Sequence, residues 1–263
     1  MTTMELSLRR DYLSQHRRMI IGRSIAASMA GLVPVPFLEE WLTSTIKRST
    51  IRRIAAAREV DLEDEAVRAI ADGPTSPPQW AEVAGGTLIY KLASKTWRRL
   101  LYAYVAARRT QAAARNFEIA TMFDHYCARL HVGMGLDGQQ AMDLHLVMAD
   151  AIEQTPGALV DRAFRRAAIA AGRATVQAPV ELLDIATGGA VRRLLSRGSD
   201  EVAAVEEVDQ ALEKQISSQK TFLARAATAV ELQLSAEANP YVDDLLDTFE
   251  RLWRGRAEVT EKQ

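Results

Sequence analysis

The sequence predicts an all-α fold, a multi-helix bundle of about ten helices that is compatible with two subdomains. Alanine is abundant, aromatic residues make up 6% of the 263 residues, and glycine and proline number only 14 and 8. This composition favours packed helices over sheets. No long stretch alternates between apolar and polar residues in the manner of a half-buried strand.

The first three predicted helices follow from hydrophobic spacing and from helix-breaking residues. A helix over 4–30 ends at Gly31 and Pro34, because proline lacks an amide hydrogen and disfavours a helical residue before it. A second helix covers 37–58. A short third helix, over 62–71, opens with acidic residues that complement the positive helix N-terminus, and the linker DGPTSPP follows it.

Turns rich in glycine, proline and serine separate the remaining predicted helices, which cover about 80–130, 139–153, 158–176, 179–196, 200–236 and 241–253. The first of these is either one long helix or a pair of helices with a break near 108–114. In the helix predicted to begin at residue 200, apolar residues recur every seven or four positions, at Val205, Leu212, Ile216, Leu223, Val230 and Leu234. This spacing places them on one helical face, which we expect to lie in the core rather than in a coiled-coil seam.

Charge is distributed unevenly along the chain, although the formal net charge is −1. Residues 1–115 contain 18 Lys or Arg and 11 Asp or Glu, which gives a net charge of +7, whereas residues 116–263 have a net charge of −8. With a boundary at the glycine-rich turn near 133–138, this asymmetry predicts a basic helical domain over 1–135 and an acidic helical domain over 136–263, and a boundary near 155–157 is the alternative. Either the two halves present opposite contact surfaces, or their charges meet across the fold.

The predicted location is the cytoplasm, with peripheral binding to the inner face of the cytoplasmic membrane as the more specific expectation. The single cysteine, Cys127, excludes an intrachain disulfide and suits a reducing compartment. The N-terminal residues lack the apolar core of a secretory signal. No stretch of about 18 residues is free of both charge and proline, so we expect no conventional transmembrane helix.

The predicted contact surface centres on a hydrophobic, proline-hinged hairpin over 19–41, which is followed by basic helices with Trp and Tyr near their Lys and Arg residues. Such side chains suit the headgroup region of an anionic bilayer, where aromatic rings lie at the interface and cationic chains reach the phosphates. A partner helix or a solvated basic face fits the same pattern. The residues assigned to this membrane or partner surface are Phe37, Leu38, Trp41, Lys47, Arg48, Arg52, Lys91, Lys95, Trp97 and Arg98.

Small residues recur at every fourth position of the first helix, at Gly22, Ala26 and Ala30. The same spacing occurs at Ala168 and Gly172. Small side chains let helix backbones approach closely, so we expect tight helix packing at these positions.

Few motifs point to catalysis, and no P-loop, HExxH, GxSxG or CxxC pattern occurs. The glycines of 133–138 match GxGxxG, but a helical pattern precedes them, so we expect an interhelical turn rather than a dinucleotide site. Asp124, Cys127 and His131 share one helical face, and His145 lies on the next helix, which would permit a zinc site if these helices pair. A small core cysteine and locally satisfied histidines are the simpler expectation. We therefore predict no enzyme activity, no cofactor and no metal.

The hinge segment resembles a known helical family. Its pattern is an alanine-rich helix, a small residue, Pro-x-Pro-Phe and an acidic residue that opens an apolar helix, and the matching residues are Ala27, Gly31, Pro34, Pro36, Phe37 and Glu39. This pattern resembles the helical domain of unknown function at the membrane end of some bacterial Era-like GTPases, and EcsC-like proteins are similar in outline. The stretch 84–101 resembles the family's second glycine-containing basic helix. Over residues 15–130 the resemblance implies a membrane-associated helical module that partners a GTPase, and it carries over no catalytic residue.

The leading prediction for function is a non-enzymatic, peripheral membrane-associated helical protein of bacteria. Its expected partner is an anionic membrane surface or a protein, for which the resemblance suggests a GTPase. The alternative is a soluble helical scaffold or adaptor whose hairpin is ordinary core, and a distant third hypothesis is a metal enzyme with a site around Cys127 and His131. Nucleic acid is not an expected partner, because no recognised motif accompanies the basic residues.

Overall fold

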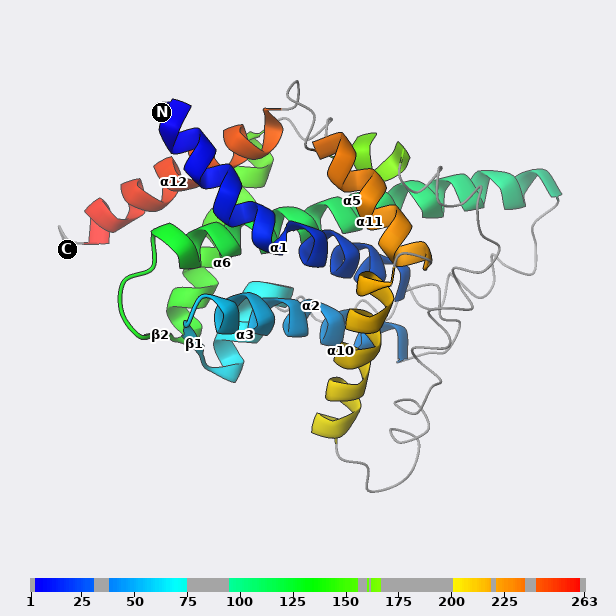
Figure 1. Ribbon diagram of the computed structural model, residues 1–263, viewed down its shortest axis with the longest axis horizontal. Helices are drawn as coiled ribbons and strands as arrows, with labels where there is room; N and C mark the ends of the chain where they lie inside the picture. Colours follow the sequence, from blue (N-terminus) through cyan, green and yellow to red (C-terminus); the bar gives the residue numbers. More distant parts are fainter. Residues whose placement is uncertain are drawn as a thin grey trace.

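Helices make up nearly all of the regular structure, which confirms the predicted all-α fold. Two long helices, α1 (Thr3–Ala30) and α5 (Lys95–Arg129), pack against each other through the middle of the molecule, and other helices lie around them (Figure 1). The first three predicted helices are confirmed to within two residues at each end. The computed structural model describes residues 3–30, 38–74, 95–155, 160, 162–166, 201–218, 221–234 and 240–260.

Helices α2 (Leu38–Ala57) and α3 (Asp64–Asp72) pack against each other, and α2 also packs on α1. Helix α2 ends because the chain turns at Glu59, whose φ of 58° is the left-handed conformation that favours glycine. The amide of Val60 then donates a hydrogen bond of 2.9 Å to the carbonyl of Ala55, which closes the end of the helix.

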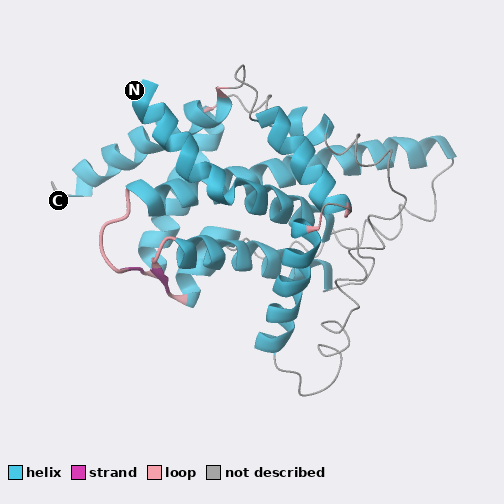
Figure 2. Ribbon diagram, viewed as in Figure 1, coloured by secondary structure: helices cyan, strands magenta, loops and turns pink. Residues whose placement is uncertain are grey.

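A short parallel strand pairing precedes α6 (Gly138–Gln154). Strand β1 (Asp61–Leu62) pairs with β2 (Gly135–Leu136), and Figure 2 shows both strands beside the loop that follows α5. The interhelical turn predicted at the three glycines is confirmed, whereas the strand pairing has no counterpart in the sequence pattern. The side chain of Asp137 accepts a hydrogen bond of 2.8 Å from the amide of Gln140 and so caps α6.

The described C-terminal part consists of three helices, α10 (Glu201–Ser217), α11 (Phe222–Leu234) and α12 (Tyr241–Thr260). The prediction of one continuous helix over 200–236 is therefore wrong. The hydroxyl of Thr221 accepts a hydrogen bond of 3.2 Å from the amide of Ala224, so this residue acts as the N-cap of a new helix. The apolar stripe predicted along this region does lie in the core, except that Val205 is only half-buried.

One continuous hydrophobic core contains residues from both halves of the chain. Ile20 and Ile46 enter it from the N-terminal helices, and Leu212, Val230 and Phe249 enter it from the C-terminal helices. The predicted domain boundary lies in the turn between α5 and α6, and the core continues across this turn.

The small residues of α1 pack closely, as predicted. Ala26 and Ala30 are fully buried. A Cβ atom at Gly22 would lie 2.8 Å from Cγ1 of Ile216 in α10, which is closer than carbon atoms pack in protein interiors. Glycine at this position therefore lets α10 lie directly against α1.

Several predicted elements lie outside the described residues. These are most of 158–176, all of 179–196 and the first part of 80–130, together with the small-residue pair Ala168 and Gly172. None of the helices in the described ranges has the length and the apolar character that a membrane crossing needs.

Candidate functional site

The first arm of the predicted hairpin lies in the protein core rather than on its surface. Ile20, Ile21, Ala26 and Ala30 each expose at most 1% of their surface. Trp41 of α2 is half-buried and packs against the same core. The expectation that this arm presents an apolar side to a membrane is corrected, because α2, α5, α10 and α11 pack around α1.

Carboxylates of the same chain compensate the predicted basic surface wherever the structure describes its side chains. Lys47 and Arg48 both bind the carboxylate of Asp72, at 3.3 and 2.8 Å. Arg52 pairs with Asp64 at 2.7 Å, so these cations do not form a free basic face. The rest of the predicted surface lies outside the described residues, namely Phe37 and Lys91 entirely and the side chains of Leu38, Lys95, Trp97 and Arg98.

A buried group of ion pairs, the Arg23 cluster, joins α1 and α2 to α10. Arg23 is fully buried, and its guanidinium donates to Asp209 at 2.7 Å and to the hydroxyl of Ser49 at 2.9 Å. Arg53 donates to Asp209 and to Glu213, each at 2.9 Å. Burial alone would raise the pKa of Asp209, but the hydrogen bond from Arg53 and the charge of Arg23 lower it below its usual value.

A second group, the His125 cluster, joins α1 and α5 to α12. His125 is 1% exposed and lies between the hydroxyl of Tyr12, at Nδ1, and the carboxylate of Glu250, 2.9 Å from Nε2. Arg9 is also buried and pairs with Asp247 at 2.7 Å and with Glu250 at 2.9 Å. The hydrogen bond from His125 lowers the pKa of Glu250 to about 2, whereas burial lowers the pKa of His125.

The order Tyr12, His125, Glu250 has the hydrogen-bond pattern of a catalytic triad with tyrosine in the nucleophile position. A nucleophile needs a lowered pKa or an adjacent base that can accept its proton at an accessible site. Burial instead raises the pKa of Tyr12 to about 12, and its partner is a buried imidazole. The arrangement therefore holds three helices together rather than activating the hydroxyl.

The buried carboxylate of Asp124 extends the His125 cluster toward the end of α2. Asp124 is fully buried and accepts hydrogen bonds from Arg58 at 2.8 Å and from Nδ1 of His16 at 2.9 Å. The guanidinium of Arg58 also lies over the ring of Tyr12, 5.6 Å from its centroid. These partners occupy the carboxylate that the zinc hypothesis assigned to a metal.

The other residues of the zinc hypothesis lie in separate environments. Burial raises the pKa of Cys127, so this residue stays a thiol within the packed helices. Nδ1 of His145 lies 3.0 Å from the carbonyl oxygen of Ile70, and the ring of His131 packs against Tyr126 at a centroid distance of 5.6 Å. Across the described ranges, no group of three metal-binding side chains gathers at one point.

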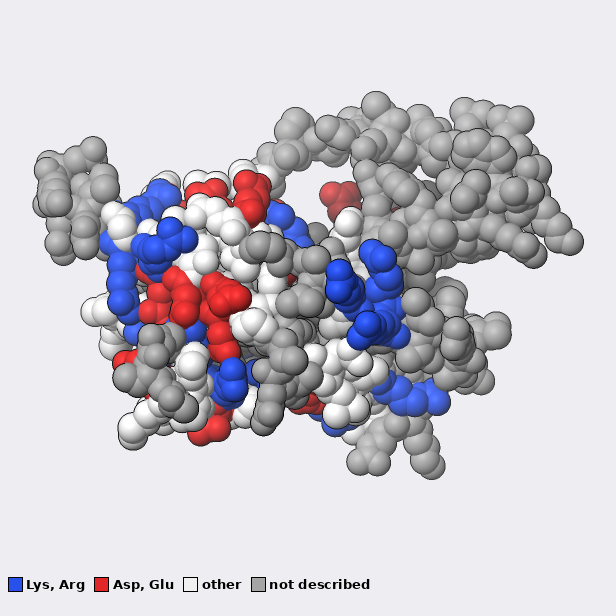
Figure 3. Space-filling view, turned by 90° about the horizontal axis from the view of Figure 1, so that it is seen from above, with Lys and Arg blue, Asp and Glu red and all other residues white. Residues whose placement is uncertain are grey.

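The opposite charges of the two halves meet across the fold, which is one of the two outcomes that the sequence left open. Arg9, Arg23 and Arg53 come from the basic half, and the carboxylates with which they pair come from the acidic half. Figure 3 shows basic and acidic side chains beside one another over the left part of the face seen from above, and a separate group of basic side chains to the right.

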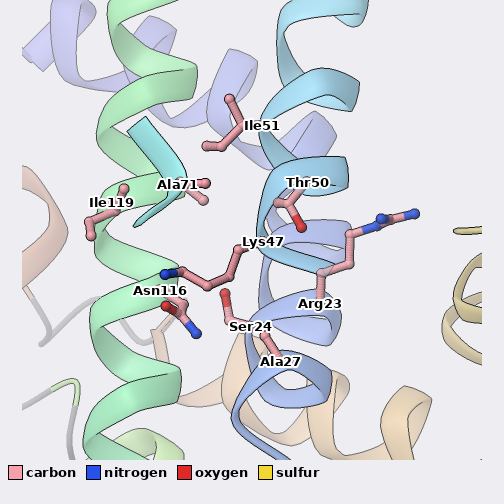
Figure 4. Close-up of a pocket in the computed structure, with 10 residues that line it drawn as sticks. Arg23, Ser24, Ala27, Lys47, Thr50, Ile51, Ala71, Asn116 and Ile119 are labelled. Atoms are coloured by element: carbon pink, nitrogen blue, oxygen red, sulfur yellow. The ribbon is translucent and has the colours of Figure 1, made fainter. Parts of the chain in front are cut away.

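A small pocket lies between α1, α2 and α5, with Ser24, Lys47, Thr50 and Asn116 as its polar lining. Figure 4 shows that the ends of the Lys47 and Asn116 side chains lie close to each other, whereas the guanidinium of Arg23 points away from them. The pocket has a volume of about 20 Å³. That space suits about one water molecule rather than an organic substrate.

Two apolar side chains stand out on the loop between α5 and β2. Val132 is 94% exposed and Met134 is 83% exposed, the highest values for large apolar side chains in the described part of the chain. The loop is fixed at both ends. The amide of His131 donates to the carbonyl of Tyr126 at 2.8 Å, and the amide of Asp61 donates to the carbonyl of Met134 at 3.1 Å. This loop is the candidate binding site of the molecule.

Comparisons with known proteins identify no family for the chain. No family model, curated protein or solved structure matches it. The resemblance to the GTPase-associated helical family therefore depends on the residues of the hinge segment alone, and the function must be argued from the geometry.

Sequence reasoning missed both ion-pair clusters and the exposed loop. Tyr12 and His125 lie 113 positions apart, and Arg9 and Glu250 lie 241 positions apart, so no local spacing pattern connects them. One feature of the sequence did indicate an exposed apolar side chain in this loop, because Met134 lies between two glycines in a predicted interhelical turn.

Proposed function

We propose that this protein is a non-enzymatic helical scaffold or adaptor that binds a protein partner through the loop 131–134. One observation carries the proposal: Val132 and Met134 are 94% and 83% exposed on a loop whose backbone is fixed at both ends. Full burial of an apolar side chain of this size contributes about 1.5–3 kcal/mol. A loop that is already ordered loses little conformational entropy on binding, so more of this free energy contributes to affinity.

The ion-pair clusters support a scaffold role. They connect helices that are distant in sequence, and Arg23 and Asp124 are fully buried within them. Buried ion pairs contribute little net stability, but the loss of one partner is strongly destabilising, so they disfavour other arrangements of the same helices. A bundle fixed in this way holds the loop 131–134 in a constant position.

Membrane association has less support from the described residues. The segment 19–30 lies largely in the core, and Lys47 and Arg48 are both held by Asp72, whose charge offsets one of their two positive charges. An anionic bilayer attracts Lys and Arg that are free to reach its surface. The scaffold proposal therefore comes first, and vesicle binding is the result that would reverse this order.

The proposal is tested with a double variant, Val132→Ser with Met134→Ser, and a control, Leu232→Ser, which changes a side chain that is 69% exposed on α11. Proteins captured from a lysate are identified, purified and titrated by calorimetry against each variant. A partner that binds the wild type and the control but not the double variant supports the proposal. The resemblance of the hinge segment makes a GTPase one protein to look for among the captured proteins.

Co-sedimentation with anionic vesicles at low salt provides the opposing measurement. We expect no binding. Vesicle binding that persists in the double variant, together with no protein partner, would contradict the scaffold function and favour a membrane-associated protein.

A further inference from the structure

Two polar side chains that line the pocket between α1, α2 and α5 form no hydrogen bonds with the rest of the described chain. Ser24 of α1 is only 3% exposed, and its hydroxyl has no partner among the described residues. The half-buried amide of Asn116, on α5, has none in these ranges either. Because buried polar groups are normally paired with protein or with a bound species, the pocket offers hydrogen-bonding groups to an occupant.

The other serines of α1 show that the free hydroxyl of Ser24 is unusual. Ser7, Ser14 and Ser28 each donate a hydrogen bond to the carbonyl three residues earlier, at 2.8, 2.7 and 2.8 Å. A serine within a helix commonly satisfies its hydroxyl in this way. Ser24 makes no such bond to the carbonyls of α1, and Figure 4 shows its hydroxyl pointing toward the side chains of Lys47 and Asn116. This hydroxyl is therefore available to a species in the pocket.

Lys47 brings a positive charge to the pocket that the chain offsets only in part. Its Nζ lies 3.3 Å from the carboxylate of Asp72, but Arg48 binds the same carboxylate more closely, through Nε and Nη2 at 2.8 Å each. One carboxylate thus serves two cations. The side chain of Lys47 is 24% exposed, so water solvates its ammonium group incompletely. The described residues that line the pocket include no carboxylate that could supply the second negative charge.

We propose that the pocket between α1, α2 and α5 binds one small inorganic anion of about the size of chloride. Lys47 supplies the opposite charge, and the hydroxyl of Ser24 and the amide of Asn116 each donate a hydrogen bond to the ion. A halide accepts hydrogen bonds and donates none, which matches three donors from three helices. The volume of about 20 Å³ has room for one such ion. The site is independent of the scaffold function proposed above.

Other occupants fit the pocket less well. A water molecule would satisfy Ser24 and Asn116, but it would leave Lys47 and Arg48 with a single carboxylate between them. A metal cation would be repelled by the ammonium group of Lys47. An organic acid is larger than the pocket. Because the ion would bind only the folded arrangement of the three helices, it should stabilise that arrangement by mass action.

The test measures the melting temperature of the full-length protein while sodium chloride replaces sodium gluconate at constant ionic strength. Gluconate is too large for the pocket, and both salts screen charges equally. Chloride at about tenfold above its dissociation constant should raise the melting temperature by roughly 3–6 °C. Sodium bromide should have a similar effect, because bromide is a halide of only slightly larger size.

Matched variants assign the chloride effect to the pocket. Ser24→Ala and Lys47→Met should each remove most of the difference in melting temperature between the two salts. The control Ser28→Ala changes a serine of the same helix whose hydroxyl is bonded to the carbonyl of Ile25, and it should keep the difference. Arg52→Met, which removes a cation of α2 that pairs with Asp64, should keep it too. Circular dichroism of each variant checks that the fold is retained, and Ser24→Ala alone is decisive if Lys47→Met does not fold.

Crystals grown in sodium bromide locate the ion directly. An anomalous bromide peak within hydrogen-bond distance of Nζ of Lys47 and the hydroxyl of Ser24 supports the proposal. Equal melting temperatures in the two salts, or the same chloride dependence in Ser24→Ala and Ser28→Ala, would overturn it. A water molecule in the pocket without anomalous signal would do the same. Bromide in the crystal without any chloride dependence in solution would show an adventitious ion only, which also contradicts the proposal.

Discussion

The Arg23 cluster and the His125 cluster both join α1 to acidic helices of the C-terminal half, but they differ in the groups that carry their charge. The Arg23 cluster consists of guanidinium groups, carboxylates and one hydroxyl. The His125 cluster contains an imidazole between a tyrosine hydroxyl and Glu250. Guanidinium groups stay charged at every pH at which the protein is folded, whereas imidazole changes its charge close to neutrality.

The difference shows that similar ion pairs can give helix contacts that differ in their sensitivity to pH. In the contact of α10 with α1, Asp209 keeps its charge until the pH falls below the ordinary range of aspartate, because Arg53 and Arg23 lower its pKa. The contact of α12 with α1 and α5 begins to change when histidine titrates. We therefore expect mild acid to loosen the α12 contact before the α10 contact.

The largest expected effect tests the Arg23 cluster directly. Arg23→Ala should lower the free energy of unfolding by about 3–5 kcal/mol, because it removes the fully buried member of an ion pair and leaves a cavity between α1, α2 and α10. Urea unfolding followed by circular dichroism measures the change. The control is Arg52→Ala, whose pair with Asp64 is exposed and should contribute less than about 1 kcal/mol. Equal losses in the two variants would show that burial does not set the strength of this contact.

The close approach of α10 to α1 gives the next effect. Gly22→Ala should cost about 1–3 kcal/mol, because the added Cβ would meet the side chain of Ile216. Combined with Ile216→Ala, it should cost less than the sum of the two single changes, since the contact has then been removed. Gly255→Ala adds a Cβ with nothing within 4 Å and should not destabilise the protein. Additive losses from Gly22→Ala and Ile216→Ala would contradict the contact.

Acid should weaken the His125 cluster in two stages. Burial lowers the pKa of His125 below 6.5, so the unfolded chain binds more protons and stability falls as the pH falls through 6.5. The pKa of Glu250 is about 2 instead of 4.5, so its contribution is lost only as the pH falls below 4.5.

Melting temperatures measured between about pH 7.5 and pH 5 test the first stage. His125→Gln should flatten this dependence without removing it, because burial also lowers the pKa of His145. The Arg23 cluster should not contribute to the change of melting temperature in this pH range. If the melting temperature of His125→Gln changes with pH as steeply as that of the wild type, this histidine is excluded as the pH-sensitive group.

The smallest effect on stability is expected at the loop 131–134. Val132→Ser with Met134→Ser should change the free energy of unfolding by less than about 0.5 kcal/mol, because both side chains are exposed. Partner binding should nevertheless be lost. A large loss of stability would show that these side chains pack against the protein and are not available to a partner.

Local chemistry made most of the fold predictable. The end of α1 at Ala30 and the start of α6 at Gly138 follow from glycine, proline and capping residues close in the sequence. The break between α10 and α11 was missed, because it contains neither glycine nor proline and depends on the side chain of Thr221. A short polar segment with a threonine N-cap resembles ordinary helix surface when only the hydrophobic spacing is considered.

The functional surface was harder to predict, because burial and pairing are set by tertiary contacts. The apolar residues of 19–30 have the composition of a membrane arm, but three-dimensional packing makes them core. Lys47 and Arg48 form a basic pair in the sequence, but both pair with Asp72 of a neighbouring helix, which offsets one of their two charges. Val132 and Met134, by contrast, are placed on the surface by a strand pairing that no local pattern indicated.

The salt bridge between Arg9 and Glu250 spans 241 positions of the chain and so affects how the protein is made. At a synthesis rate of roughly 5–20 residues per second, Arg9 emerges from the ribosome roughly 10–50 seconds before its partner. For most of that interval the nascent α1 has neither α10 nor α12 to cover it. Helix α1 is therefore enclosed only after the much later helices have been made, and a ribosome that stalls before residue 201 would leave its apolar face open to chaperones or to other nascent chains.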